Sequence, residues 1–284
     1  MDLFFDLLRS VIYGVIEGIT EWLPISSTGH MILAEQVLKF SFSAEFMEMF
    51  RVVIQLGAIL AVVVMYFKKL WPFCVDNGRD SGLAKPVRWP VMRLWFKIIV
   101  ACLPAAVLGL ALDDWIDAHF YNSVVVAVML IVYGIAFILI ERRPRVPTTT
   151  KLSRITYRQA LLVGAWQVLA LIPGTSRSGS TIIGGLLLGC TRSVASKFTF
   201  FLAIPVMFGA SALKLVKYFI KGGTFGANEV AILGVGCVVA FVVSLAAIRF
   251  LMDYVKRHNF TFFGIYRIAL GLVVLAVAVV SAMV

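Results

Sequence analysis

The stretch Leu23-Pro-Ile-Ser-Ser-Thr-Gly-His30 interrupts an apolar region that covers residues 11–38. A second stretch, Ile172-Pro-Gly-Thr-Ser-Arg-Ser-Gly-Ser-Thr181, interrupts the apolar residues 160–189 in the same way. Proline ends a helix because its ring removes a backbone donor, and serine or threonine favours the first position of the helix that follows. Each region is therefore predicted to be a half-helix, a polar loop and a second half-helix.

The composition places these two regions in a membrane. Of the 284 residues, 61% are hydrophobic and 14% are charged, whereas a soluble domain has about 45–50% apolar and about 25% charged residues. Irregular backbone at membrane depth must be buried in protein or line a cavity, so the two regions are predicted to be re-entrant helix-loop-helix hairpins. Six further apolar runs approach the roughly 20 residues of a membrane span: 50–67, 94–112, 121–140, 198–219, 230–251 and 262–284. The predicted fold is an all-α polytopic membrane protein with six transmembrane helices and two hairpins.

The two halves of the chain resemble each other. A shift of 150 positions places Ser26 on Ser176, and each hairpin is followed by three predicted spans. An odd number of spans reverses the direction of the second copy, which gives the inverted-topology repeat of many transporters. We expect one membrane domain over residues 1–284, with the first inverted repeat at 1–150 and the second at 151–284.

The basic residues behind the net charge of +11 lie mostly in the loops between the apolar runs. Such a charge on a soluble protein would raise the question of nucleic acid, but here Lys and Arg gather in short loops at 68–93, 141–158 and 253–261. Basic loops stay in the cytoplasm, so these three are predicted to be cytoplasmic and no nucleic-acid partner is expected.

The same rule orients the rest of the chain. The loop with Asp113, Asp114 and Asp117 carries no Lys or Arg and is expected outside, together with both termini. The lysines at 214, 217 and 221 fit this pattern less well, because they lie near an external loop. The orientation sends the first hairpin in from outside and the second from the cytoplasm, so their tips can meet inside the bilayer.

Two acidic residues precede the first loop. Glu17 and Glu21 are four residues apart, so they share a helix face at a separation of about 6 Å. A carboxylate in an apolar stretch is costly and indicates function. Two such groups hold a proton or share a cation, and a divalent cation such as Mg²⁺ or Ca²⁺, completed by phosphate oxygens, suits them. The alternative is a helix at the membrane surface with both glutamates in water.

A serine pair and a histidine follow in the first loop. A serine hydroxyl becomes a nucleophile when a base accepts its proton, and histidine is the usual base. We expect Ser27 to be the nucleophile and His30 its base. Ser26 is the alternative nucleophile, and water activated by Glu21 or His30 is a further one. A purely structural alternative is that a serine only caps the second half-helix.

Arg177 stands at the tip of the second hairpin. A buried Arg is expensive and attracts an anion, and its planar fork matches phosphate. The neighbouring hydroxyls of Ser176, Ser178 and Thr181, with backbone N–H groups freed by glycines, are expected to complete a phosphate clamp. The alternative is a structural ion pair between Arg177 and one of the two glutamates.

Four other polar residues in the spans have weaker assignments. Arg51 and Gln55 begin a span and are expected to line the cavity. Arg249 and Arg267 are expected to extend their side chains to the cytoplasmic surface of the membrane.

The two loops together resemble the undecaprenyl-diphosphate phosphatase family, also called bacitracin-resistance proteins. The matching motifs are Glu-x-x-x-Glu at Glu17 to Glu21, running into Leu-Pro-Ile-Ser-Ser-Thr-Gly-His30, and Pro-Gly-Thr-Ser-Arg-Ser-Gly-Ser-Thr from Pro173 to Thr181. The similarity extends through the span order and nearly the whole chain. Functional positions carried over by the resemblance are Glu17, Glu21, Ser26, Ser27, His30, Ser176, Arg177, Ser178 and Thr181.

This resemblance implies an activity. Members remove the terminal phosphate from a long polyprenyl diphosphate, and the product is the lipid carrier for cell-wall peptidoglycan precursors. It further implies a metal-dependent site in the cell (inner) membrane that opens toward the periplasm, an inverted-repeat fold, and dimers. The competing class is a lipid transporter or flippase, because inverted repeats and broken helices are also a transport signature. A transporter has no need of a Ser and His pair beside two carboxylates.

Overall fold

The protein is described here by a computed structural model that places residues 3–38, 42–73, 87–143 and 146–283. Their secondary structure is helical: α1 Leu3–Thr20, α2 Ser27–Val37, α3 Ala44–Leu70, α4 Trp89–Phe120, α5 Ser123–Arg142, η1 Leu152–Arg154, α6 Tyr157–Val168, η2 Leu169–Leu171, α7 Arg177–Leu187, α8 Arg192–Ile220, α9 Ala227–Arg257 and α10 Thr261–Met283. Three basic residues in the loop-charge argument, Arg79, Lys85 and Arg145, lie outside the described residues.

The six predicted spans are confirmed as helices. Within the described residues, six helices are long and apolar enough to cross a membrane: Glu45–Leu70, Trp89–Leu112, Ser123–Arg142, Arg192–Ile220, Ala227–Arg257 and Thr261–Ser281. Most are longer than the apolar run that predicted them, because polar residues continue the terminal turns, as Lys68 and Lys69 do in α3. The prediction of an all-α polytopic membrane protein is therefore confirmed.

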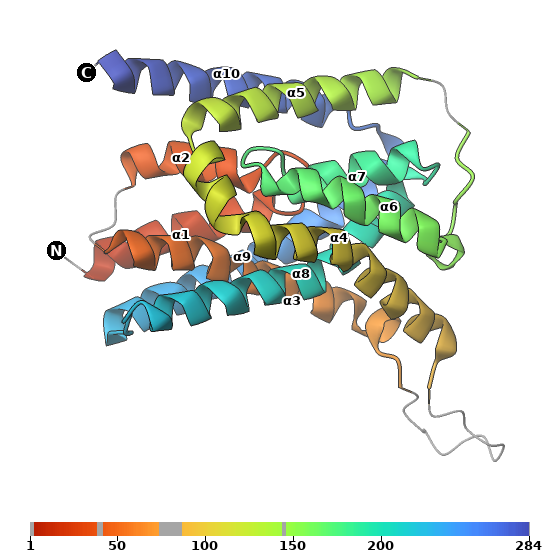
Figure 1. Cartoon of the computed structure of the whole chain (residues 1–284), viewed down its shortest axis with the longest axis horizontal. Helices are drawn as coiled ribbons and strands as arrows, with labels where there is room; N and C mark the ends of the chain where they lie inside the picture. Colours follow the sequence, from red (N-terminus) through yellow and green to blue (C-terminus); the bar gives the residue numbers. More distant parts are fainter. Residues whose placement is uncertain (1–2, 39–41, 74–86, 144–145, 284) are drawn as a thin grey trace.

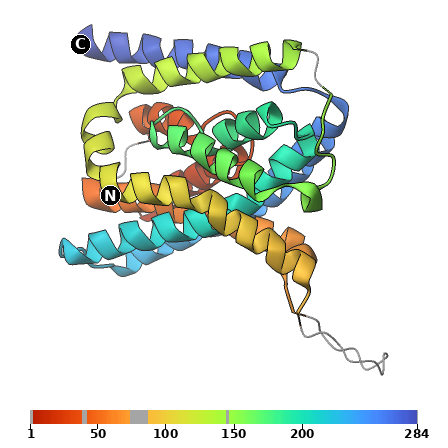
Figure 2. The ribbon, with the colours of Figure 1, turned by 45° about the vertical axis from the view of Figure 1, so that its right-hand side comes forward.

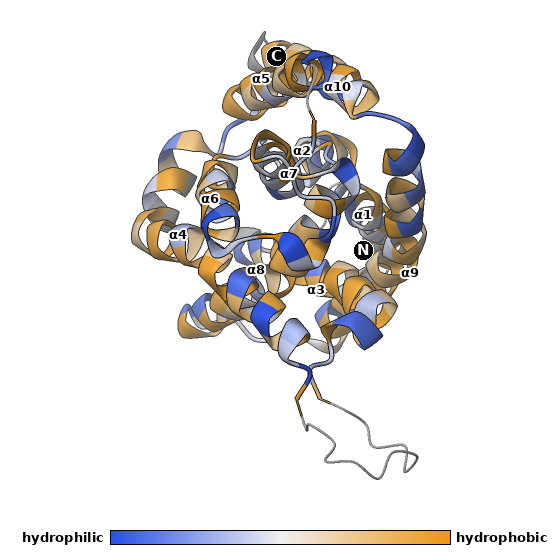
Figure 3. Ribbon diagram, turned by 90° about the vertical axis from the view of Figure 1, so that its right-hand side faces the viewer, coloured by the Kyte–Doolittle hydropathy of each residue, from blue (hydrophilic) through white to orange (hydrophobic). Residues whose placement is uncertain are grey.

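The long helices enclose the short ones. Figure 3 looks along the molecule and shows α2 and α7 near the centre, with α5 and α10 above them, α9 and α4 to the sides and α3 and α8 below. Apolar residues dominate the outer surfaces of these long helices. Both termini lie at one end of the molecule (Figures 1 and 2). The polar loops are thus held in the interior of the bundle.

The two short helix pairs enter from opposite ends. Figure 1 shows α1 and α2 reaching inward from the end with the termini, and α6 and α7 reaching inward from the other end. Their tips meet, since the Ser178 hydroxyl approaches the Leu23 carbonyl oxygen at 3.5 Å. Ser26 (φ 72°) and Ser176 (φ 70°), which precede α2 and α7, are the non-glycine residues with positive φ in the described chain. The two loops therefore share an uncommon backbone conformation.

Close packing fixes the hairpins against the long helices. A Cβ atom at Gly164 of α6 would lie 2.2 Å from the Ala101 carbonyl oxygen of α4, so only glycine permits this approach. The tip of the first hairpin is anchored by the fully buried Trp22, whose ring meets Phe200 of α8 edge-on at 5.2 Å. Both loops are consequently held by rigid neighbours.

Gly174 in the second tip gives a stability prediction. Its φ is +89°, and a Cβ there would lie 2.6 Å from the Val126 carbonyl oxygen. Gly174→Ala adds backbone strain of about 1–3 kcal/mol and a clash, so the Tm in detergent is expected to fall by roughly 3–10 °C. Gly209→Ala is the matched control, because no atom lies within 4 Å of a Cβ there. An equal Tm for the two variants would contradict the account of this loop.

Candidate active site

Arg177 and Glu21 meet where the tips of the hairpins meet. The Arg177 Nη2 donates to Glu21 Oε1 at 2.9 Å, and the two side chains are 12% and 9% exposed. Arg177 Nη1 donates to the Thr199 carbonyl oxygen at 3.1 Å, while its buried Nε has no partner. The structure thus brings together an acidic and a basic group that are 156 positions apart. The guanidinium keeps an unused donor for another acceptor.

The carboxylate pair fits a cation. Glu17 is 1% exposed, and its buried Oε1 has no hydrogen-bond partner. An unpaired buried carboxylate oxygen is costly, and a proton or a cation removes that cost. Among the described residues no group of three or more His, Cys, Asp and Glu is positioned for a metal. A pair of carboxylates matches the donor set of an ion such as Mg²⁺, which proteins commonly hold through one or two carboxylates.

The serine pair of the first loop divides into two environments. Ser27 lines a cavity, and its Oγ lies 3.3 Å from Glu21 Oε2, to which it donates. Ser26 is 1% exposed, and its Oγ has no partner. Although Ser26 precedes α2, its side chain makes no capping hydrogen bond. Capping therefore does not account for either hydroxyl.

His30 is occupied at both ring nitrogens. Its Nδ1 lies 2.7 Å from the Ser26 carbonyl oxygen, and its Nε2 lies 2.7 Å from the Tyr266 hydroxyl. The described contacts of His30 thus do not include Ser27, whose hydroxyl points to Glu21. In this arrangement Glu21, rather than the expected His30, is the acceptor next to the Ser27 proton.

The hydroxyls of the second loop organise its backbone. Ser176 Oγ accepts from the Gly179 N–H at 3.1 Å and lies 3.1 Å from Ser178 Oγ. Thr181 Oγ1 donates to the Arg177 carbonyl oxygen at 2.9 Å and accepts from Thr199 Oγ1 at 2.8 Å. Thr181 is fully buried and in this structure holds Arg177 in place.

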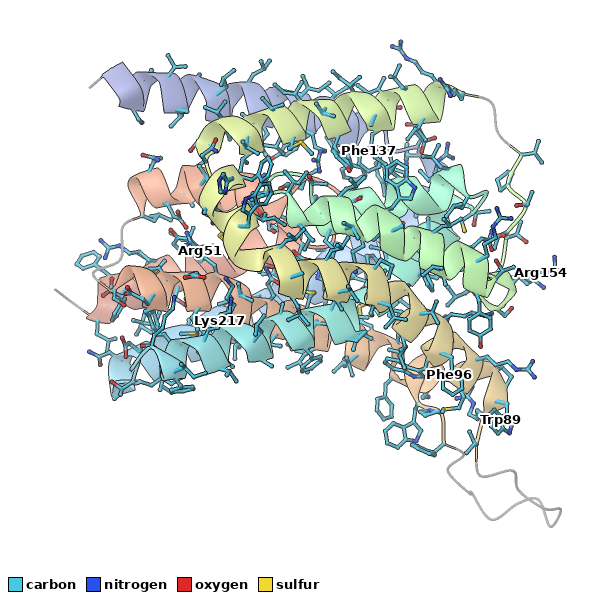
Figure 4. The ribbon with its side chains drawn as sticks, in the orientation of Figure 1. Arg51, Trp89, Phe96, Phe137, Arg154 and Lys217 are labelled. Carbon is cyan, nitrogen blue, oxygen red and sulfur yellow. The ribbon has the colours of Figure 1, made fainter. Side chains whose placement is uncertain are left out.

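A cavity of about 550 Å³ is lined by two of the predicted site residues, Glu17 and Ser27. Arg51 and Gln55 line it, as predicted, and Figure 4 shows Arg51 toward the end of the molecule that carries the termini, with Arg154 at the far end. Lys214, which fitted the loop-charge pattern poorly, pairs with Glu48 at 2.6 Å on the cavity wall. The charged residues of the lining are balanced in sign, with three acidic and three basic side chains. The full lining is Glu17, Ser27, Thr28, Met31, Glu45, Glu48, Arg51, Val52, Gln55, Tyr121, Lys214 and Lys221.

The expectation for Arg267 is wrong. Its side chain does not reach the membrane surface but is fully buried. It donates to the carbonyl oxygens of Pro24 at 3.3 Å and of Gly174 and Thr175 at 2.9 Å each. Arg267 lies about two turns into α10. At this depth a long side chain can reach either the membrane surface or the protein interior, so the sequence position alone did not decide between them. The signal that was available is the charge itself, since an Arg inside an apolar span is a functional hypothesis by default.

Comparison with known proteins identifies the family of the chain. The family model described as "Bacitracin resistance protein BacA" matches residues 10–273. The undecaprenyl-diphosphatase of Enterococcus faecalis is 58% identical over 275 residues, which cover 96% of this chain and 98% of the relative. That of Lactococcus lactis subsp. lactis is 55% identical over 281 residues, covering 98% and 99%. That of Streptococcus thermophilus is 56% identical over 272 residues, covering 95% and 92%. The chain therefore belongs to the bacitracin resistance protein BacA family.

Proposed function

We propose that the protein is a membrane phosphatase that hydrolyses undecaprenyl diphosphate to undecaprenyl phosphate and inorganic phosphate. The relatives at 55–58% identity carry the name undecaprenyl-diphosphatase. The product is the lipid carrier for peptidoglycan precursors, and its regeneration confers resistance to bacitracin. The observation that supports this activity most strongly is the contact between Glu21 and Arg177, together with the hydrogen bond to Glu21 from Ser27, which lines the cavity.

Arg177 binds the diphosphate in this proposal. Its guanidinium moves its donors from Glu21 to phosphate oxygens, and the unpartnered Nε adds a further donor. The backbone N–H groups at the start of α7 and the hydroxyls of Ser176 and Ser178 complete the clamp. These donors stabilise the charge that develops on the phosphoryl oxygens during transfer.

Ser27 attacks the terminal phosphorus. Its Oγ forms the new P–O bond while the bond from that phosphorus to the bridging oxygen breaks, and undecaprenyl phosphate leaves with the bridging oxygen. Glu21, 3.3 Å from Ser27 Oγ, accepts the hydroxyl proton. Water then attacks the phosphoserine, phosphate departs, and the proton returns to Ser27 Oγ. The competing routes are attack by Ser26 and direct attack by water. Neither of them forms a phosphoserine at residue 27.

Glu17 and Glu21 would hold the divalent cation, Mg²⁺ or Ca²⁺. When bound, the ion supplies Lewis-acid stabilisation of charge on phosphate oxygens. The unpartnered Glu17 oxygen supports this assignment.

The cavity gives the proposed site an orientation. Its lining includes Glu45 at the start of α3 and Lys221 after the end of α8, and these helix ends lie at the end of the molecule that carries the termini (Figure 1). Because basic loops stay in the cytoplasm, the site opens on the outer, periplasmic side of the cell membrane in this proposal. The inverted orientation of the two repeats and the formation of dimers stay predictions.

Removal of divalent cations tests the proposed activity. We expect purified protein in detergent to release phosphate from undecaprenyl diphosphate, to lose this activity in a chelator, and to regain it with Mg²⁺ or Ca²⁺. Glu17→Gln is expected to raise the cation concentration needed for half-maximal rate, because one ligand loses its charge. Detergent provides no membrane to cross, so a transporter would release no phosphate in this assay. Full activity in chelator would contradict the metal assignment.

A further inference from the structure

Two consecutive residues of α10, Tyr266 and Arg267, contact both loops. Tyr266 reaches the first loop through His30, and Arg267 reaches the backbone of both tips. Neither residue lines the cavity. We propose that Tyr266 and Arg267 are positioning residues, which hold the two loops in the arrangement that aims Ser27 at a bound diphosphate. This inference rests on the proposed phosphatase function.

The Tyr266 contact fixes the proton on His30. The Ser26 carbonyl oxygen can only accept a hydrogen bond, so His30 Nδ1, at 2.7 Å, must carry the proton. The neutral ring then presents an unprotonated Nε2, which accepts from the Tyr266 hydroxyl at 2.7 Å. The two rings also stack, with centroids 5.7 Å apart and an interplanar angle of 10°. Tyr266 therefore sets both the tautomer and the plane of His30.

His30 in turn holds a strained residue. Ser26 has φ 72°, a conformation that is costly for a non-glycine residue and persists only where its surroundings impose it. The His30 hydrogen bond grips the carbonyl group of this residue, directly before Ser27. The chain of contacts thus runs from Tyr266 through His30 to the backbone that carries the Ser27 hydroxyl. His30 acts on Ser27 through the backbone and does not need to touch its proton.

Arg267 ties this loop to the second one. Its Nη1 donates to Pro24, two residues before Ser26, and its Nη2 donates to Gly174 and Thr175, just before Ser176. A single fully buried guanidinium therefore sets the spacing between the two positive-φ serines. Lysine has one compact ammonium group and cannot span both loops in this manner.

The test compares Tyr266→Phe with wild-type protein. The phenylalanine keeps the stacked ring and removes only the hydroxyl. We expect kcat for phosphate release to fall about 10- to 100-fold, as misplacement of reacting groups does, with KM within about twofold, since the phosphate donors are untouched. Tyr254→Phe is the matched control. The Tyr254 ring also stacks on a histidine, His258, with ring centroids 4.7 Å apart, but this pair lies outside the site. Removal of the Tyr254 hydroxyl should therefore leave kcat and KM unchanged. Wild-type kcat in Tyr266→Phe would overturn the proposal.

A double-mutant cycle separates positioning from general stability. If Tyr266 acts through His30, then adding Tyr266→Phe to His30→Ala costs no further activity, because the intermediary is already gone. Independent, multiplying losses would overturn the chain of contacts. Arg267→Lys is expected to lower kcat more than Tyr266→Phe; if it fails to fold, the Tyr266 variants still decide the question.

Nitrogen-15 spectra of the histidine rings distinguish failure of this inference from failure of the proposed function. With ¹⁵N-histidine in detergent, wild-type His30 is expected to show a protonated Nδ1 and an unprotonated Nε2. Tyr266→Phe should shift the His30 signals and leave those of His119 and His258 unchanged. If the wild-type protein has no phosphatase activity but Tyr266→Phe still shifts the His30 signals, the proposed function alone is refuted. Unshifted His30 signals refute the inference whatever the activity.

Discussion

Arg177→Ala is expected to lower kcat/KM for phosphate release about 100- to 1,000-fold, which is the usual effect of removing one charge-stabilising donor. The variant loses the partner of Glu21 and the side chain proposed to bind phosphate at the same time. The measurement is steady-state phosphate release in detergent, alongside Tm to confirm that the protein is folded.

Two variants serve as controls for this result. Arg177→Lys keeps the charge but loses the planar fork, so it should recover only part of the activity. Arg249→Ala removes an exposed arginine of α9 and should leave kcat/KM unchanged. An Arg177→Ala protein that is folded and as active as the Arg249 variant would remove Arg177 from the site.

Ser27→Ala is expected to lower kcat by more than about 1,000-fold, as loss of a covalent nucleophile does in other hydrolases. Ser27 lines the cavity and donates to Glu21. Ser26 is buried and does not line the cavity. Rapid quenching of wild-type turnover with substrate labelled at the terminal phosphate should trap the label on Ser27.

Ser26→Ala is the matched control for the nucleophile. Its backbone keeps the neighbouring contacts, so a moderate loss of kcat from altered loop strain is expected, with the label still trapped on Ser27. Label on Ser26 would assign the nucleophile to that residue instead. Near-normal turnover of Ser27→Ala would exclude the covalent route through Ser27.

Much of the fold follows from local signals in the sequence. The apolar runs predicted the six long helices because a membrane span must be apolar and continuous. Proline followed by serine predicted both loops, whose tips approach each other. The inverted orientation inferred from the charge of the connecting loops stays a prediction. These are properties of short segments, which a pattern of residue types can carry.

The side-chain partners depended on three-dimensional placement. The sequence predicted that Glu21 and Arg177 belong to one site and favoured a phosphate clamp, with a structural ion pair as the alternative; the structure shows the ion pair. It paired Ser27 with His30 by proximity along the chain, whereas α10 supplies the partner of His30 from 236 positions away. Arg267 was misplaced because a distance along a helix does not tell which way a long side chain turns.

In the proposed mechanism the two hairpins form one diphosphate site. Calorimetric titration of the detergent-solubilised protein with a polyprenyl methylene-diphosphonate, which cannot be hydrolysed, tests it most directly. We expect one binding event per chain, weakened both by Glu17→Gln in the first hairpin and by Arg177→Ala in the second. Binding that survives unchanged in either variant, or two events that each respond to one hairpin alone, would contradict it.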